Sequence, residues 1–195
     1  MSVIFLKHLE ITSYLEFLSF KDGGRKVKDK LDDKLLKYVY RKNYDKIKKI
    51  VDKGANINAV DEEGRNALIH ALLESEGEIE MIDFLISLGA DYKISDKEGW
   101  TALHYVARDQ KEELVNKLLE YDVNIDAVDS YGNTPLWRCV MNKTPNINIV
   151  RALLKKGANP NKKNNHDVSP KDIVSNSDDK TGLDKKIIEL FESAH

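Results

Sequence analysis

The side chains best suited to catalysis or metal binding in this chain are five histidines and one cysteine, and their placement points away from both chemistries. The residues are His8, His70, His104, His166, His195 and Cys139, which are scattered without any metal-ligand spacing. The sequence also lacks a glycine-rich phosphate loop, a G-x-S-x-G nucleophile turn and a paired-carboxylate signature. It therefore predicts no enzyme, no cofactor and no metal site.

Aromatic and arginine side chains between residues 100 and 138 indicate a different chemistry, the recognition of another macromolecule. Trp100, Tyr105, Arg108, Tyr131 and Arg138 are of the types that dominate protein-binding hot spots. The alternative is structural, with Trp100 folded over a neighbouring turn and Tyr105 packed between helices. For the cluster as a whole we favour a binding surface.

A repeated pattern must position these residues. Asp61, Asp96 and Asp129 begin three similar stretches that start 35 and 33 residues apart, and a glycine follows each aspartate three positions later. Periods of this length indicate stacked helical repeats. Apolar residues recur at helical spacings within each stretch. A hydrophobic content of 41% is enough for a continuous core.

Two motifs indicate the type of repeat. They are the T-P-L-H-like turns Thr101-Ala102-Leu103-His104 and Thr134-Pro135-Leu136-Trp137, and the G-A-D/N endings Gly54-Ala55-Asn56, Gly89-Ala90-Asp91 and Gly157-Ala158-Asn159. With them the chain resembles the ankyrin-repeat family from about residue 31 to near the C-terminus. The resemblance implies an all-α solenoid of stacked helix-turn-helix units with short hairpin-like turns. It also implies that His104 forms hydrogen bonds within its turn.

The pattern divides the chain into four repeats, at residues 31–60, 61–95, 96–128 and 129–164, and a partial C-terminal capping repeat at 165–195. Residues 1–30 do not match. Ser13 and Glu16 there have capping-box spacing, so we expect an N-terminal helical cap followed by a polar linker from Gly23 to Lys30. Contact of this segment with a partner is the alternative. Extra residues at 75–77 and 143–146 are expected in surface loops.

The resemblance further implies that the turn tips and the inner helices form one concave surface that holds another protein. Carried over position by position, the partner-binding residues are Tyr40, Arg41, Arg65, His70, Trp100, Tyr105, Arg108, Tyr131, Arg138 and Met141. We expect Trp100→Ala combined with Tyr105→Ala to weaken partner binding without unfolding the repeats.

Charge suggests the kind of partner. The net charge of −2 conceals an acidic centre, because residues 61–129 carry 18 acidic and 6 basic side chains between basic ends. Such a centre favours a protein partner with a basic surface. The leading interpretation is a non-enzymatic protein-binding module, acting as an inhibitor or as an immunity protein that neutralises a cognate toxin. The alternatives are a scaffolding adaptor or effector with several partners, and nucleic-acid binding through the lysine-rich first repeat.

The sequence also suggests a compartment. A single cysteine excludes an intrachain disulfide and suits a reducing environment. No apolar run in the sequence is long enough to cross a membrane. The apolar N-terminus lacks the basic region and the cleavage site of a signal peptide. We expect a cytoplasmic protein that is monomeric when free, with no small-molecule substrate and no membrane association.

Overall fold

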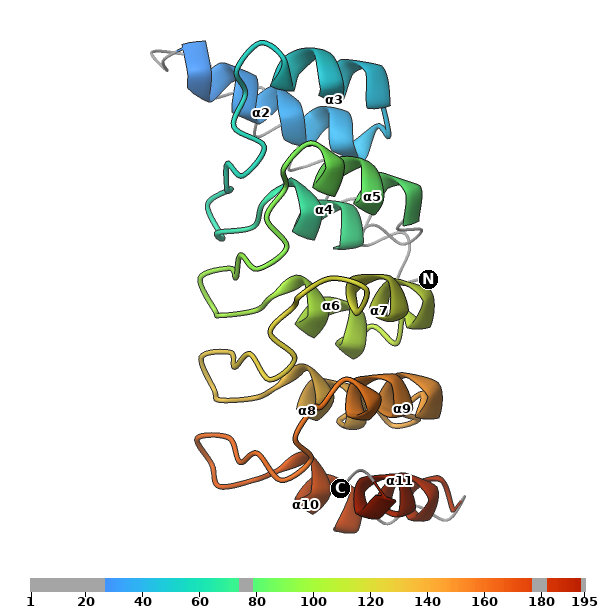
Figure 1. The fold of residues 1–195 in the computed structure, drawn as a ribbon. Coiled ribbons are helices and arrows are strands. Elements are labelled where there is room, and N and C mark those ends of the chain that lie inside the picture. Colours follow the sequence, from blue (N-terminus) through green and yellow to red (C-terminus); the bar gives the residue numbers. More distant parts are fainter. Residues whose placement is uncertain (1–26, 74–78, 177–181, 194–195) are drawn as a thin grey trace, which may run out of the picture.

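The computed structural model describes residues 27–73, 79–176 and 182–193, which form five successive helix pairs stacked into an elongated body (Figure 1). The inner helices are α2 (Val27–Tyr40), α4 (Ala67–Leu73), α6 (Ala102–Arg108), α8 (Pro135–Val140) and α10 (Pro170–Ser175). The outer helices are α3 (Tyr44–Val51), α5 (Ile79–Ser87), α7 (Glu112–Leu118), α9 (Ile147–Lys155) and α11 (Leu183–Ser193). The expected all-α solenoid is confirmed.

One continuous core joins the pairs. Each inner helix contacts the inner helix of the next pair, and α5, α7, α9 and α11 are stacked in the same way. Equivalent leucines fill the space between the inner helices, and each is at most 1% exposed: Leu35, Leu68, Leu103 and Leu136. A helix pair cannot bury such a face alone, so stability comes from the stacking of neighbours.

Hairpin-like tips project from the inner-helix side of the stack and lie one above another (Figure 1). Backbone hydrogen bonds link successive tips: Lys97 N to Glu63 O at 2.9 Å, Ser130 N to Glu98 O at 2.8 Å, and Asn165 N to Tyr131 O at 2.9 Å. This close approach explains the tip glycines. Gly99 has φ +78°, and a Cβ atom there would lie 3.0 Å from Asp129 Cα of the next tip. The tips therefore form a connected ladder.

The N-terminal boundary differs from the expected one. α2 begins at Val27, so residues 27–30 belong to a helix and not to a linker. The expected cap helix at residues 13–20 and the insertion at residues 75–77 lie outside the described residues. In the second insertion, the Asn146 side chain caps α9 by accepting from Asn148 N. No helix in the described stretches is long and apolar enough to cross a bilayer.

Candidate protein interface

Each of three tips is held together by the aspartate that begins it. Asp96 Oδ1 accepts hydrogen bonds from the backbone N–H groups of Glu98 and Trp100, at 2.9 and 2.8 Å. Asp61 and Asp129 accept from the corresponding N–H groups of their own tips. A tight turn leaves such donors without helical partners, and a carboxylate satisfies them locally. The three aspartates therefore fix the shape of the tips.

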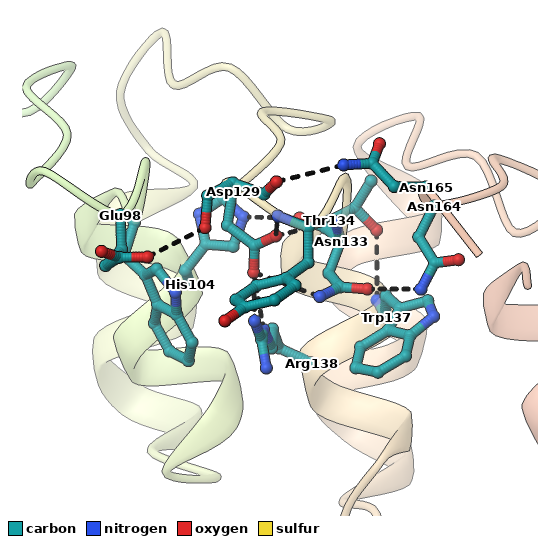
Figure 2. A network of polar contacts seen from close by, with 12 residues as sticks. Glu98, His104, Asp129, Asn133, Thr134, Trp137, Arg138, Asn164 and Asn165 are labelled. Atoms are coloured by element: carbon teal, nitrogen blue, oxygen red, sulfur yellow. Dashed lines mark hydrogen bonds and ion pairs between the residues drawn. The ribbon is translucent and has the colours of Figure 1, made fainter.

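The second carboxylate oxygen is bound by the residue nine positions further along the chain, on the inner helix. The pairs are His70 Nε2 with Asp61 Oδ2 at 2.8 Å, Tyr105 Oη with Asp96 Oδ2, and Arg138 Nε with Asp129 Oδ2 at 2.9 Å. Arg138 Nη2 donates to the same oxygen of Asp129 (Figure 2). An imidazole, a phenol and a guanidinium thus serve one structural role in three consecutive repeats.

This arrangement corrects the interpretation of two expected binding residues. His70 is 1% exposed and Tyr105 is 8% exposed. Their polar atoms are bound to the tip aspartates, so both residues support the tips from inside and do not lie open to a partner. A Tyr105→Ala substitution would release a tip as well as alter the surface, which makes it unsuitable for testing binding.

The carboxylates of Asp61 and Asp129 stay ionised despite their burial. Burial alone would raise the pKa of Asp61, but hydrogen bonds from His70 and the Arg65 backbone, with the Arg65 charge, hold that pKa well below its usual range. Burial would also raise the pKa of Asp129, and the Arg138 guanidinium and two backbone N–H groups lower it instead. Burial, reinforced by the bond to Asp96, raises the pKa of Tyr105, so the phenol remains a donor.

Tyr40 extends the first of these pairs into a chain of three groups. Its hydroxyl is bonded to His70 Nδ1, while His70 Nε2 is bonded to Asp61. A phenol, an imidazole and a carboxylate in series have the composition of a proton relay. The side chains of His70 and Asp61 are only 1% and 2% exposed, however, so no substrate reaches them. These hydrogen bonds tie α2 to the tip that begins at Asp61.

His104 occupies the turn as the resemblance implied. Its Nδ1 accepts from the Thr101 backbone N–H at 3.1 Å, and its Nε2 lies 3.0 Å from the carbonyl oxygen of Asn133 in the next repeat. Since Nδ1 accepts, Nε2 carries the proton and donates to that carbonyl. Burial lowers the pKa of His104, which keeps the ring neutral. The histidine therefore joins two repeats.

Four partly exposed side chains form what we name the arginine–tryptophan row: Arg108, Trp100, Arg138 and Trp137, whose Nε1 is buried. The Arg108 Cζ lies 5.0 Å from the centroid of the Trp100 ring, and the Arg138 Cζ lies 4.3 Å from it. The Arg138 Cζ is also 5.4 Å from the centroid of the Trp137 ring. Guanidinium groups at these distances are attracted to the ring faces. Arg108 ends α6, and Trp137 and Arg138 lie on α8, so the row joins these two inner helices.

The other expected binding residues surround the row or lie nearer the N-terminus. Tyr131, at a tip, and Met141, which follows α8, are each 53% exposed. Arg65 is paired with Asp61 and with Glu63. Arg41 is exposed after the end of α2, and Tyr40 is half-buried. The structure thus brings Trp100, Arg108 and Arg138 together, places Tyr131 at the tip of the fourth repeat, and leaves Tyr40 and Arg41 two repeats away.

Sequence reasoning assigned no structural role to the tip aspartates. Asp129 is 4% exposed, and each of the three binds its own tip and its own inner helix. The signal was present as an aspartate that recurs with the repeat period, nine residues before a side chain able to donate a hydrogen bond. A solvated charge would not need to keep that register.

The acidic charge of the central repeats lies on other elements than the row. α4, α6 and α8 have the sequences ALIHALL, ALHYVAR and PLWRCV, without a single acidic residue. Part of the acidic charge lies on α5, on α7 and in the segment after α7, as Glu80, Asp83, Glu112, Glu113, Glu120 and Asp122, and part lies at the tips, as Glu62, Glu63 and Glu98. A partner with a basic surface would be attracted to these acidic elements and not to the inner helices.

The described residues offer little for catalysis. Among them, no group of three or more His, Cys, Asp and Glu side chains could hold a metal ion. Cys139 is buried, and burial raises the pKa of its thiol to about 12. A thiol with such a pKa is not a nucleophile near neutral pH.

Comparison with known proteins decides the family. A family model described as ankyrin repeats in three copies matches residues 75–164, and another, described as ankyrin repeats in many copies, matches residues 35–86. A putative ankyrin repeat protein of Rickettsia bellii (strain RML369-C) is 30% identical over 132 residues, which cover 67% of this chain and 72% of that protein. The chain belongs to the ankyrin-repeat family.

Two mammalian ankyrin-repeat relatives are much longer than the region they share with this chain. SH3 and multiple ankyrin repeat domains protein 2 of Homo sapiens is 32% identical over 104 residues, 53% of this chain and 6% of that protein. The B-cell lymphoma 3 protein homolog of Mus musculus is 36% identical over 121 residues, 60% of this chain and 26% of that protein. Ankyrin repeats are protein-interaction modules, and that coarse function extends to this member.

Proposed function

We propose that this ankyrin-repeat protein holds one partner protein against its tips and inner helices, with the contact centred on repeats three and four. The arginine–tryptophan row carries the proposal. Arginine and aromatic residues dominate binding hot spots. Here the guanidinium groups are already stacked on indole rings, so binding costs little further side-chain entropy.

The role that we propose for this binding is inhibition of the partner. An accessible row confined to two adjacent repeats suits one segment of one protein, as an inhibitor or an immunity protein against a toxin requires. A scaffolding adaptor would instead recover several partners through separate surfaces. A toxin encoded beside this gene, and protection of cells from that toxin by co-expression of this protein, is the outcome expected of an immunity protein.

Affinity purification from the native host, followed by quantitative mass spectrometry, tests the binding site. The bait is the full chain, compared with the double variant Trp100→Ala/Tyr131→Ala. Tyr131 replaces Tyr105 in this design because its ring is exposed and its tip is bonded through the backbone. We expect the double variant to lose the partner, with an affinity for the purified partner about 30-fold weaker, equal to about 2 kcal/mol.

The matched control is Glu113→Ala/Lys155→Ala, which removes two exposed side chains from the outer helices α7 and α9. It should bind the partner within about twofold of the unmodified chain, well under 1 kcal/mol. Circular dichroism melts of all variants show that the repeats remain folded. Equal partner recovery by the unmodified chain and by Trp100→Ala/Tyr131→Ala would reject the row as the site.

A further inference from the structure

The charged groups that reach solvent at the row indicate the chemistry of its partner. The side chains of Arg108, Arg138 and Arg65 are 41%, 20% and 25% exposed. The carboxylates that pair with the last two, Asp129 and Asp61, are 0% and 2% exposed. A buried carboxylate neutralises part of the field but offers no surface to a ligand. At Arg138 a partner therefore meets the guanidinium face, whereas Arg65 has beside it the Glu63 carboxylate, whose side chain is 56% exposed.

The two arginines of the row also keep donors for a ligand. Arg138 bonds Asp129 through Nε and Nη2, and Arg108 bonds Asp109 through the same two nitrogens. In the part of the chain that the structure describes, Nη1 of neither residue makes a hydrogen bond. A guanidinium with one edge anchored and another open is oriented before a ligand arrives, and it suits carboxylate oxygens.

The inner helices around the row carry no negative charge. No acidic residue lies on α4, α6 or α8. Asp109 and Glu63 pair with Arg108 and Arg65. The remaining exposed acidic charge of the chain's centre is divided between the tips, as at Glu62 and Glu98, and the outer helices α5 and α7.

We propose that the row binds an acidic, extended polypeptide segment, whose carboxylates reach Nη1 of Arg108 and Arg138 and whose aromatic or apolar side chains lie against Trp100 and Tyr131. This inference rests on the proposed function and names the partner's chemistry. It departs from the basic partner suggested by the total charge. The local charge decides between them, because the inner helices that carry Arg108 and Arg138 have no acidic residue of their own.

A single-stranded nucleic acid is the other polyanion that could stack on tryptophan. The observations favour a polypeptide, because Asp109 and Glu63 at the edge of the row would repel a backbone that carries one phosphate per nucleotide. A peptide can place its carboxylates two or more residues apart and leave neutral positions opposite these two groups.

Fluorescence anisotropy with defined probes tests the proposal. The probes are fluorescein-labelled peptides of about 12 residues, one with Asp, Glu and Phe and a matched one with Lys in place of every acid, and a thymidine oligonucleotide. The full chain is titrated at about 50 mM and about 300 mM salt. We expect the acidic peptide to bind at least about tenfold more tightly than the basic one, and less tightly at the higher salt.

Two charge-reversal variants localise the binding. Arg108→Glu and Lys155→Glu make the same change of charge, and each alters the last residue of its helix, α6 or α9. Their effects on net charge and on the helix dipole therefore match. Arg108→Glu should weaken the acidic peptide at least about tenfold, while Lys155→Glu should change it less than about twofold.

Tighter binding of the basic peptide, tighter binding of the oligonucleotide, equal effects of the two variants, or no binding of the acidic peptide at about 1 mM would each overturn the inference. These failures are distinct from failure of the proposed function. If the peptide tests fail but the Trp100→Ala/Tyr131→Ala variant does not recover the native partner, the proposed binding site is supported. Only the proposed acidic chemistry of the partner is then wrong.

Discussion

Replacing Arg138 by isoleucine tests whether this residue anchors a tip. The change removes the cation that faces the Asp129 carboxylate, whose side chain is 0% exposed. Breaking a buried ion pair by deleting one partner costs about 3–5 kcal/mol. Because the Arg138 side chain retains 20% exposure, water can reach the site after the change, and we expect a loss of about 3 kcal/mol in the free energy of unfolding.

The fifth repeat of the same chain supplies the control. There the tip residue is Asn164, which accepts from the N–H groups of His166 and Val168, and the residue nine positions later is Ile173. An asparagine and an isoleucine therefore suffice when no carboxylate is present. The double variant Asp129→Asn/Arg138→Ile reproduces this pair and should recover about 1–2 kcal/mol relative to Arg138→Ile alone.

Urea unfolding followed by circular dichroism at pH 7 measures these differences. The same series at lower pH adds a second readout. The folded-state pKa of Asp129 lies below its unfolded value of 3.8, so its stabilisation is present above that pH and is lost as the pH falls. In Arg138→Ile the folded pKa rises, and the loss of stability on acidification becomes shallower. A loss under about 0.5 kcal/mol at pH 7, or a double variant no more stable than the single one, would refute the anchoring role.

Three further predictions concern the turns. Gly99→Ala should lower the free energy of unfolding by about 2–4 kcal/mol in urea, because it combines a left-handed backbone with a Cβ atom 3.0 Å from Asp129 Cα. Asp167→Gly changes the equivalent position of the last tip, where φ is +63°, and should instead raise the free energy of unfolding by about 0.5 kcal/mol. Equal losses for Gly99→Ala and Asp167→Gly would contradict the role of tip stacking. The unmodified chain should lose stability as the pH falls below the ordinary histidine pKa of 6.5, because the folded pKa of His104 is depressed and the unfolded state takes up the proton first. In His104→Gln this loss should disappear. Identical profiles of stability against pH for both chains would exclude His104 as the titrating group.

The fold could be predicted because the ankyrin signature lies in short local motifs. Thr134 begins α8 by accepting from Trp137 N, as its place before a proline suggests, and the leucines at the repeat period face the core. Such features depend on residues within one turn of each other. The start of α2 was missed because Lys28, Asp29 and Lys30 are charged and lie in a stretch that contains no repeat motif.

The site was predicted less well because exposure depends on neighbours from other parts of the chain. The sequence shows that Tyr105 and Trp100 are aromatic and near each other, but not that the Tyr105 hydroxyl turns inward to Asp96 while Trp100 is held between two arginines. Total charge was also misleading. It counts Asp61 and Asp129 as surface although both are buried, and it cannot assign Glu113 to an outer helix and Arg108 to an inner one.

Differences between repeats at the position nine residues after the tip aspartate do not indicate a binding role. Histidine, tyrosine and arginine replace one another there because each can donate a hydrogen bond to the same carboxylate oxygen, and any one of them satisfies the tip. Variation between repeats that sets partner specificity is then expected where the tip does not use the side chain. In repeats three and four this condition is met by Trp100, by Tyr131, and by the residue twelve positions after the tip aspartate, Arg108 or Met141. Exchanging Arg108 and Met141 between the two repeats would leave every tip hydrogen bond in place. It would reverse the order of the charged and the apolar side chain along the inner helices. The exchange should therefore change which partner segment binds without changing stability.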